Sequence, residues 1–171
     1  MTSPRTFRLM NFVEHNLALV IVAVTIIVVE RMVKFYVTQN LRIGESIRVI
    51  GNFLRITRAE NTGAGFGILQ GQSWLFVLAA LVVMVLIIYF YNQIIYNMLL
   101  VFAFALILGG TVGNLMDRLF FGHVIDYIDL AFWPTFNLSD LALSAGALLL
   151  IVYLYMCKNQ PEKEAVKYVH Y

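Results

Sequence analysis

Residues 74–116 read WLFVLAALVVMVLIIYFYNQIIYNMLLVFAFALILGGTVGNLM and contain no Asp, Glu, Lys or Arg. The charge-free stretch extends further toward the N-terminus, because the nearest residues of these four types are Glu60 and Asp117. A helix needs about 20 mostly apolar residues to cross a hydrocarbon core of roughly 30 Å. The polar sequence YNQIIYN divides the stretch into segments of about 74–91 and 98–116, which we expect to form an antiparallel pair of membrane helices.

Two further apolar segments flank this pair, at about 17–37 and 138–157. The 171 residues are 61% hydrophobic and only 13% charged, whereas a soluble domain is about half apolar and a quarter charged. The first segment lacks an A-x-A-like end and continues into charged residues, so we expect a retained helix and not a cleaved signal peptide. The sequence therefore predicts an all-α membrane protein with four transmembrane helices, forming a single integral membrane domain over 1–171.

The segment from 38 to 73 lies between the first and second predicted helices. Within it, Ile47 and Val49 alternate with Arg48, and Ile56 follows Arg55. This alternation predicts two short, half-buried strands, which would form a small β-cradle. The segment 118–137 is predicted to be a loop on the same side of the membrane.

Charge and cysteine content exclude some classes of protein. The formal net charge is only +2, which argues against nucleic acid as a partner. The single cysteine, Cys157, excludes an intramolecular disulfide. Four spans place both termini on one side of the membrane, but Arg and Lys occur on both sides, so the positive-inside rule gives no orientation.

Polar and ionisable residues gather at the span ends on the side of the 38–73 segment. Such groups at membrane depth are costly, so each one indicates a functional site by default. Four clusters share this layer: Glu30 with Lys34, Asn114 with Asp117 and Arg118, Asp126 with Asp129, and Asn137 with Asp140.

The third predicted span carries a polar stripe. Gly110, Asn114 and Arg118 are spaced by four residues, so they share one helix face and predict a polar site lined by this helix. Gly109 and Gly113 form a small-xxx-small pair, which allows another helix to approach closely.

Asp126 and Asp140 are two acids at one membrane interface. Each also has a plainer interpretation: Asp126 in a solvated loop, and Asp140 as a first-turn acid in a helix capped by Asn137 or Ser139. Together they favour acid–base chemistry, because two adjacent carboxyl groups share one proton and can both activate water and polarise a carbonyl group. Two alternatives stay open: a structural subunit whose acids cap helices, and a transporter or channel subunit whose acids bind cations.

Five motifs in this order resemble those of the lipoprotein signal peptidases (signal peptidase II) of bacterial membranes. They are the E-x-x-x-K of Glu30 to Lys34, NTGAGFGIL (61–69), GGTVGNLMDR (109–118), GHVIDYID (122–129) and FNLSD (136–140).

The resemblance implies an aspartic-type peptidase without cofactor or metal. Asp126 and Asp140 match the family's catalytic pair, and Glu30, Lys34 and Asp129 match supporting positions. The positions that match the substrate and inhibitor pocket are Asn61, Gly63, Gly110, Asn114, Arg118 and Asn137.

The implied substrate is a prolipoprotein whose cysteine already carries diacylglycerol, cut on the N-terminal side of that cysteine. The resemblance also implies a monomer in contact with membrane lipid and inhibition by peptide antibiotics of the globomycin type. It places the chain in the bacterial cytoplasmic membrane, with both termini in the cytoplasm and the site at the outer face. The segments 38–73 and 118–137 would then be extracytoplasmic.

Four positions depart from the usual family pattern. Glu30 stands where the family normally has Asp, Gly65 and Ser139 each replace an alanine, and Tyr127 replaces a phenylalanine. The departures leave the implied reaction class unchanged. The alternative function is a non-enzymatic transporter or channel subunit with an interfacial acidic site.

Overall fold

The computed structural model describes residues 4–63 and 69–159, and three of its helices are long and apolar enough to cross a membrane. These are α1 (Pro4–Asn40), α4 (Met98–Phe121) and α5 (Leu138–Lys158). A fourth apolar helix, α2 (Ser73–Tyr89), has 17 residues, which is at the lower limit of about 17–25 residues for a spanning helix. A helix is thus found at each of the four predicted segments.

Helix α4 runs beyond its predicted end at about residue 116. It ends at Phe121, and Gly122 follows with φ +77°, in the left-handed region that favours glycine. At its other end, the Asn97 side chain accepts hydrogen bonds from the backbone N–H groups of Leu99 and Leu100. Arg118, at the start of the predicted 118–137 loop, therefore belongs to the last turn of a helix, and Asp117 precedes it in the same helix.

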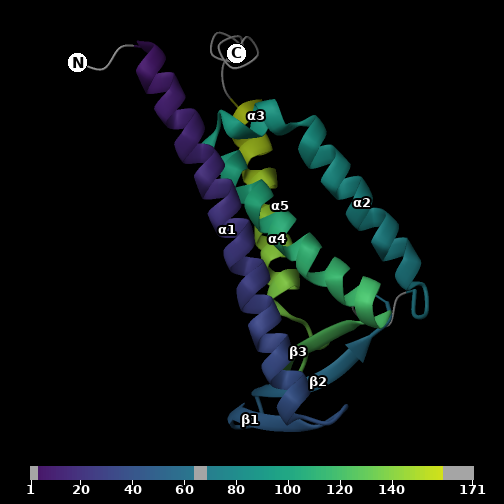
Figure 1. The fold of residues 1–171 in the computed structure, drawn as a ribbon. Helices are drawn as coiled ribbons and strands as arrows, with labels where there is room; N and C mark the ends of the chain where they lie inside the picture. The colour runs from purple at the N-terminus through teal and green to yellow at the C-terminus, as the bar shows by residue number, and fades with distance from the viewer. Residues whose placement is uncertain (1–3, 64–68, 160–171) are drawn as a thin grey trace.

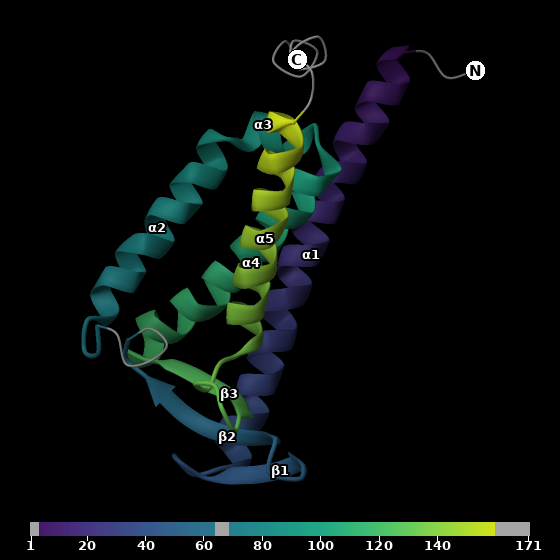
Figure 2. The ribbon, with the colours of Figure 1, turned by 180° about the vertical axis from the view of Figure 1, so that it is seen from behind.

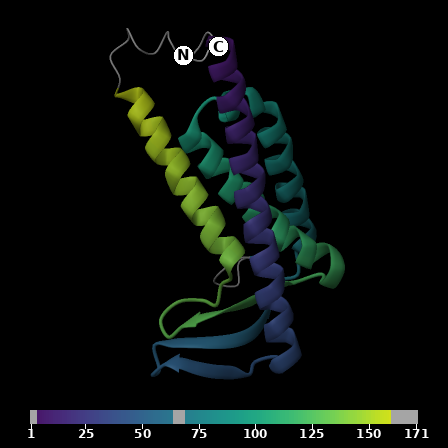
Figure 3. The same cartoon turned by 60° about the vertical axis from the view of Figure 1, so that its left-hand side comes forward.

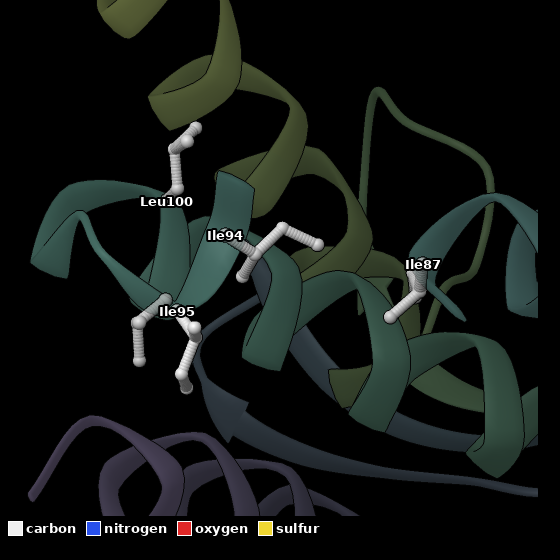
Figure 4. Close-up of a cluster of buried hydrophobic side chains, with 5 residues drawn as sticks. Ile87, Ile94, Ile95 and Leu100 are labelled. Carbon is white, nitrogen blue, oxygen red and sulfur yellow. The ribbon is translucent and has the colours of Figure 1, made fainter. Parts of the chain in front are cut away.

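The predicted turn between α2 and α4 contains a short helix, α3 (Tyr91–Ile95). Its residues Ile94 and Ile95 are buried and pack with Ile87 and Leu100 (Figure 4). The turn was predicted from its polar residues, but its two isoleucines close the apolar interior at this end of the helices.

Three antiparallel strands form a sheet in the order β1 (Ser46–Ile50), β2 (Leu54–Asn61) and β3 (Val124–Leu130). The two predicted strands are confirmed, but the side chains of β1 are exposed and not half-buried. The third strand was not predicted and comes from the supposed 118–137 loop. The cradle is therefore built from two separate parts of the chain.

The sheet lies at the end of the bundle where α1 ends and α5 begins, while the start of α1 and the end of α5 lie at the opposite end (Figure 1). Figures 2 and 3 show the same arrangement from behind and from the side.

Close packing of α4 depends on its glycines. A Cβ at Gly109 would lie 3.0 Å from the carbonyl oxygen of Ala23 in α1, and a Cβ at Gly113 would overlap Oγ of Ser139 in α5. The prediction that these glycines allow close helix approach is confirmed.

Candidate active site

A cavity of about 420 Å³ lies between α2, α4, α5 and the segment around β3. Its apolar wall includes Phe76, Ala80 and Val83 of α2 and Leu143 of α5. Its polar lining contains six of the residues that the motifs imply: Asn61, Gly63, Asn114, Arg118, Asp126 and Asp140. The fold thus brings together residues from four separate motifs at one site.

Asp126 is 2% exposed and lies on β3, not in a solvated loop. Its Oδ1 accepts a hydrogen bond from Nδ2 of Asn137 at 2.7 Å, and its Oδ2 accepts one from Nδ2 of Asn61 at 3.0 Å. Burial raises the pKa of Asp126 to about 7, with a smaller contribution from the nearby charge of Asp140, although the Asn61 hydrogen bond acts in the opposite direction. This carboxyl group therefore changes its charge near neutral pH.

Asp140 lies in the first turn of α5 and forms a capping box with Asn137. Its Oδ2 accepts the backbone N–H of Asn137 at 3.2 Å, while Oδ1 of Asn137 accepts the backbone N–H of Asp140 at 2.9 Å. Oδ1 of Asp140 accepts a hydrogen bond from Nδ2 of Asn114 at 2.8 Å. The capping interpretation is therefore correct, and the same carboxylate also lines the cavity.

Asn137 connects the two acids from behind the cavity wall. It is fully buried, and its side-chain amide donates to Oδ1 of Asp126 while its backbone N–H donates to Asp140. The same amide donates to Oδ1 of Asn114 at 3.0 Å. The two carboxyl groups are thus linked through neutral amides, which orient both without adding charge.

Arg118 brings a positive charge to the cavity. Its guanidinium lies 4.7 Å from the ring centroid of Phe76, within the usual distance of a cation–π contact. One of its terminal nitrogens donates to the carbonyl oxygen of Gly63 at 3.3 Å. Gly110, on the same helix, packs tightly against Ser139 and Leu143 of α5 and lies behind the wall.

A buried ion network supports the site from the side of α1. The predicted pair Glu30–Lys34 is present at 2.7 Å, and Lys34 also contacts Oδ2 of Asp117 at 2.6 Å. Arg31 pairs with Oδ1 of Asp117 at 2.7 Å. Two acids and two bases balance in charge, and Nζ of Lys34 extends the network to Oδ1 of Asn114 at 3.2 Å.

Asp129 lies on β3 away from the cavity lining. Its carboxylate accepts hydrogen bonds from Arg55 and from Oγ1 of Thr57 on the neighbouring strand. Burial opposes its ionisation, but these hydrogen bonds and the charge of Arg55 prevail and lower the pKa of Asp129. Its contacts join β2 to β3.

Sequence reasoning missed three contributors to this region. Asp117 was predicted to lie in the polar layer but was given no role, although an acid within a spanning helix signals a buried partner. Arg31, an ionisable residue inside the first predicted span, gave the same signal. Tyr127 gave none, because its hydrogen-bond partner Glu30 lies far away in the sequence. Of the NTGAGFGIL motif, residues 64–68, including Gly65, lie outside the described residues.

Within the described residues, no three His, Cys, Asp or Glu side chains come together as a group that could hold a metal ion. The functional groups that line the cavity include carboxyl, amide and guanidinium groups, together with the side chains of Thr111, Thr135 and Trp133. Among these, the carboxyl pair is suited to proton transfer, and the amides and the guanidinium are suited to binding carbonyl groups.

The fold and the cavity define a multi-pass membrane protein with a paired-carboxyl site at one end of its helices. Residues 22–156 match the family model described as signal peptidase (SPase) II. The chain therefore belongs to the signal peptidase II family, which confirms the resemblance found in the motifs.

Individual relatives agree with this assignment. A protein named lipoprotein signal peptidase from Halothermothrix orenii is 39% identical over 79% of this chain and 93% of its own length. One of the same name from Syntrophomonas wolfei is 39% identical over 82% and 94%. A solved structure titled as a bacterial membrane enzyme superposes with a TM-score of 0.79 at 31% identity, covering 84% of this chain and 92% of that one. The chain is thus a multi-pass bacterial membrane protein of a peptidase family.

Proposed function

We propose that this chain is an aspartic endopeptidase that removes the signal peptide from diacylglyceryl-modified prolipoproteins, cutting before the lipidated cysteine. Family membership supports the reaction and the class of substrate. The observation that carries the aspartic mechanism is the placement of Asp126 and Asp140 on one cavity, linked through Asn137.

The two acids divide the chemistry between them. The ionised acid takes a proton from water, and the resulting hydroxide attacks the carbonyl carbon of the scissile peptide bond. The protonated acid gives its proton to the carbonyl oxygen, so that a neutral tetrahedral intermediate forms. Collapse of this intermediate breaks the C–N bond, and the leaving amine receives a proton from the acid that had taken one from water. The other acid takes back a proton from a hydroxyl group of the intermediate, which leaves the carboxylic acid product and restores both acids to their starting states. Burial raises the pKa of Asp126 to about 7, so this residue can hold the proton of the pair near neutral pH.

The remaining polar residues of the cavity position the substrate and the acids. Asn114 supports Asp140 directly, since it donates to the carboxylate. Arg118, with Asn61 and Gly63 nearby, would bind backbone carbonyl groups of the peptide. Gly110 and Asn137 act from behind the wall, by closing the α4–α5 contact and by linking the acids.

We also propose four membrane crossings, with α2 as the short fourth span. Its surface carries exposed apolar side chains such as Leu78, Val85 and Ile88, and its 17 residues at about 1.5 Å each extend roughly 25 Å. Both termini would lie in the cytoplasm and the cavity at the outer face. The chain would act as a monomer in contact with lipid, without a cofactor, and would be inhibited by peptides of the globomycin type.

Cleavage of a synthetic diacylglyceryl-modified prolipoprotein by purified protein in detergent tests the function. We expect wild-type protein to cut before the modified cysteine, and Asp126→Asn and Asp140→Asn to be at least about 100-fold slower. Circular dichroism confirms that each variant is folded. Full activity in either variant would remove that acid from the mechanism, and an inactive wild type would favour the non-enzymatic alternative.

A further inference from the structure

The hydroxyl group of Tyr127 lies between the strand that carries Asp126 and the helix that carries Asp140. Its oxygen donates to Oε2 of Glu30 in α1 at 2.7 Å and accepts the backbone N–H of Leu138 at 3.1 Å. Tyr127 is only 4% exposed. One buried oxygen therefore connects β3, α1 and the first residue of α5.

This hydroxyl lies behind the site and not in it. Side chains of consecutive strand residues point to opposite faces, so Tyr127 points away from the cavity that Asp126 lines. Its ring packs in an apolar cluster with Val37 and Leu41 of the α1 end. Tyr127 is therefore connected to the acids through the backbone: it follows Asp126 directly in β3, and its hydroxyl accepts the N–H of Leu138, two residues before Asp140.

Each partner of the hydroxyl is itself held in place. Glu30 is fully buried and paired with Lys34, which is bound in turn to Asp117. Leu138 contributes one of the backbone N–H groups that a helix start leaves without a helical partner. Burial raises the pKa of the Tyr127 hydroxyl far above its usual value, and the adjacent Glu30 carboxylate adds to the effect. The hydroxyl thus remains a hydrogen-bond donor at every physiological pH.

We propose that Tyr127 is a positioning residue, and that the Glu30–Tyr127–Leu138 link sets the placement of the Asp126 strand relative to the Asp140 helix turn. This inference rests on the proposed peptidase function, because it assigns the link a role in the chemical step. Without the hydroxyl, the partly buried N–H of Leu138 and a buried carboxylate oxygen of Glu30 each lose a partner. The first turn of α5 can then move relative to β3, and both acids must reach the same water and carbonyl for reaction.

The test is Tyr127→Phe, which keeps the ring and removes only the hydroxyl. We expect kcat on the synthetic prolipoprotein to fall about 10-fold, with KM unchanged within about 2-fold since no substrate contact is lost. Tyr36→Phe is the matched control, because Tyr36 is also near the end of α1 but is 65% exposed. It should keep the wild-type kcat.

A second variant, Glu30→Asp, tests the other end of the hydrogen bond. It keeps the charge but shortens the side chain by one methylene group, so that the carboxylate draws away from the Tyr127 hydroxyl. If the two residues form one link, the double variant Glu30→Asp/Tyr127→Phe should lose little more kcat than the worse single variant. Losses that multiply in the double variant would overturn the link.

The outcomes separate this inference from the proposed function. A wild type without cleavage activity overturns the function itself. If the wild type cleaves and Asp126→Asn and Asp140→Asn do not, the function stands, and an unchanged kcat in Tyr127→Phe overturns only the positioning role. A lower melting temperature with normal kcat, or a raised KM alone, would equally overturn it.

Discussion

The two ends of the helix bundle are held together by different physical means. At the α3 end, Ile87, Ile94, Ile95 and Leu100 form an apolar cluster, with few polar ties such as the hydrogen bond from Nδ1 of His15 to the Ile95 carbonyl oxygen at 2.6 Å. At the sheet end, buried carboxylates, amides and cations contact one another over α1, α4, β3 and α5.

The apolar end mainly contributes to the stability of the fold, whereas the polar end fixes the relative positions of its side chains. Apolar contacts are non-directional, so a cluster of about the right volume holds helices together and tolerates conservative change. Hydrogen bonds and buried ion pairs require fixed distances and angles, and their loss leaves groups unpaired. The proposed reaction needs two acids in one place and therefore depends on the second kind of contact.

The largest effect is expected from removing a charge at the sheet end. Lys34→Met leaves Glu30 and Asp117 without their shared cation, and breaking a buried ion pair from one side costs about 3–5 kcal/mol. We therefore expect a large drop in the free energy of unfolding, measured in detergent micelles, together with loss of cleavage. Lys158→Met is the control, because Lys158 is exposed in the last turn of α5. Equal stability of the two variants would contradict the importance of the network.

A smaller effect, of a different kind, is expected at the α3 end. Ile94 is 1% exposed, and truncation of such a side chain in Ile94→Ala should cost about 2–4 kcal/mol of unfolding free energy. We expect kcat below the melting temperature to remain at the wild-type value, since Ile94 does not line the cavity. Ile88→Ala serves as the control at a side chain that is 75% exposed. A marked fall in kcat for Ile94→Ala would show that the two ends are not separable.

The smallest effect concerns proton equilibria at the sheet end. The raised pKa of Asp126, about 7, keeps this acid protonated below that pH and ionised above it. If Asp126 is the proton donor, kcat/KM should fall as the pH rises through about 7. Asn61→Leu removes a hydrogen bond that favours the ionised form of Asp126. The pH at which kcat/KM falls (the limb of the pH profile) should therefore be higher in this variant.

Asn40→Leu is the control for that measurement, because Asn40 is an exposed asparagine whose side chain donates to the Tyr36 carbonyl oxygen of its own helix. A limb that moves to lower pH in Asn61→Leu would assign the opposite role to the Asn61 hydrogen bond. A profile without a limb near pH 7 would exclude Asp126 as the titrating donor.

The sequence predicts the helices and the polar layer well for physical reasons. Membrane helices leave long apolar runs, and each charge near a run, such as Lys34 or Asp140, is conspicuous against that background. The residues 122–129 also pointed to a site, through motif resemblance. What the motifs imply about roles remains a set of proposals.

Strand β3 could not be predicted, because its sequence VIDYIDL has no clear alternation. Asp126 faces the cavity and Tyr127 faces α1, so both sides of the strand are covered and both carry polar atoms. In the sequence, the acids Asp126 and Asp129 are therefore more typical of a solvated loop than of a strand. The Glu30–Tyr127 contact joins residues 97 positions apart, and no local pattern reports such a pair.

The capping box at the start of α5 gives Asp140 two duties, with a consequence for how the chain can change. Asp140→Ala would remove both a cavity acid and the acceptor of the backbone N–H of Asn137, which is one of the two hydrogen bonds of the capping box. Asp140→Asn keeps an acceptor oxygen, so it isolates the acid chemistry from the folding of the turn. A substitution that keeps both a carboxyl group in the cavity and an acceptor for the backbone N–H of Asn137 is limited to glutamate, because no other amino acid offers a carboxylate. Because one side chain serves both the cavity and the helix start, very few substitutions can be accepted at position 140.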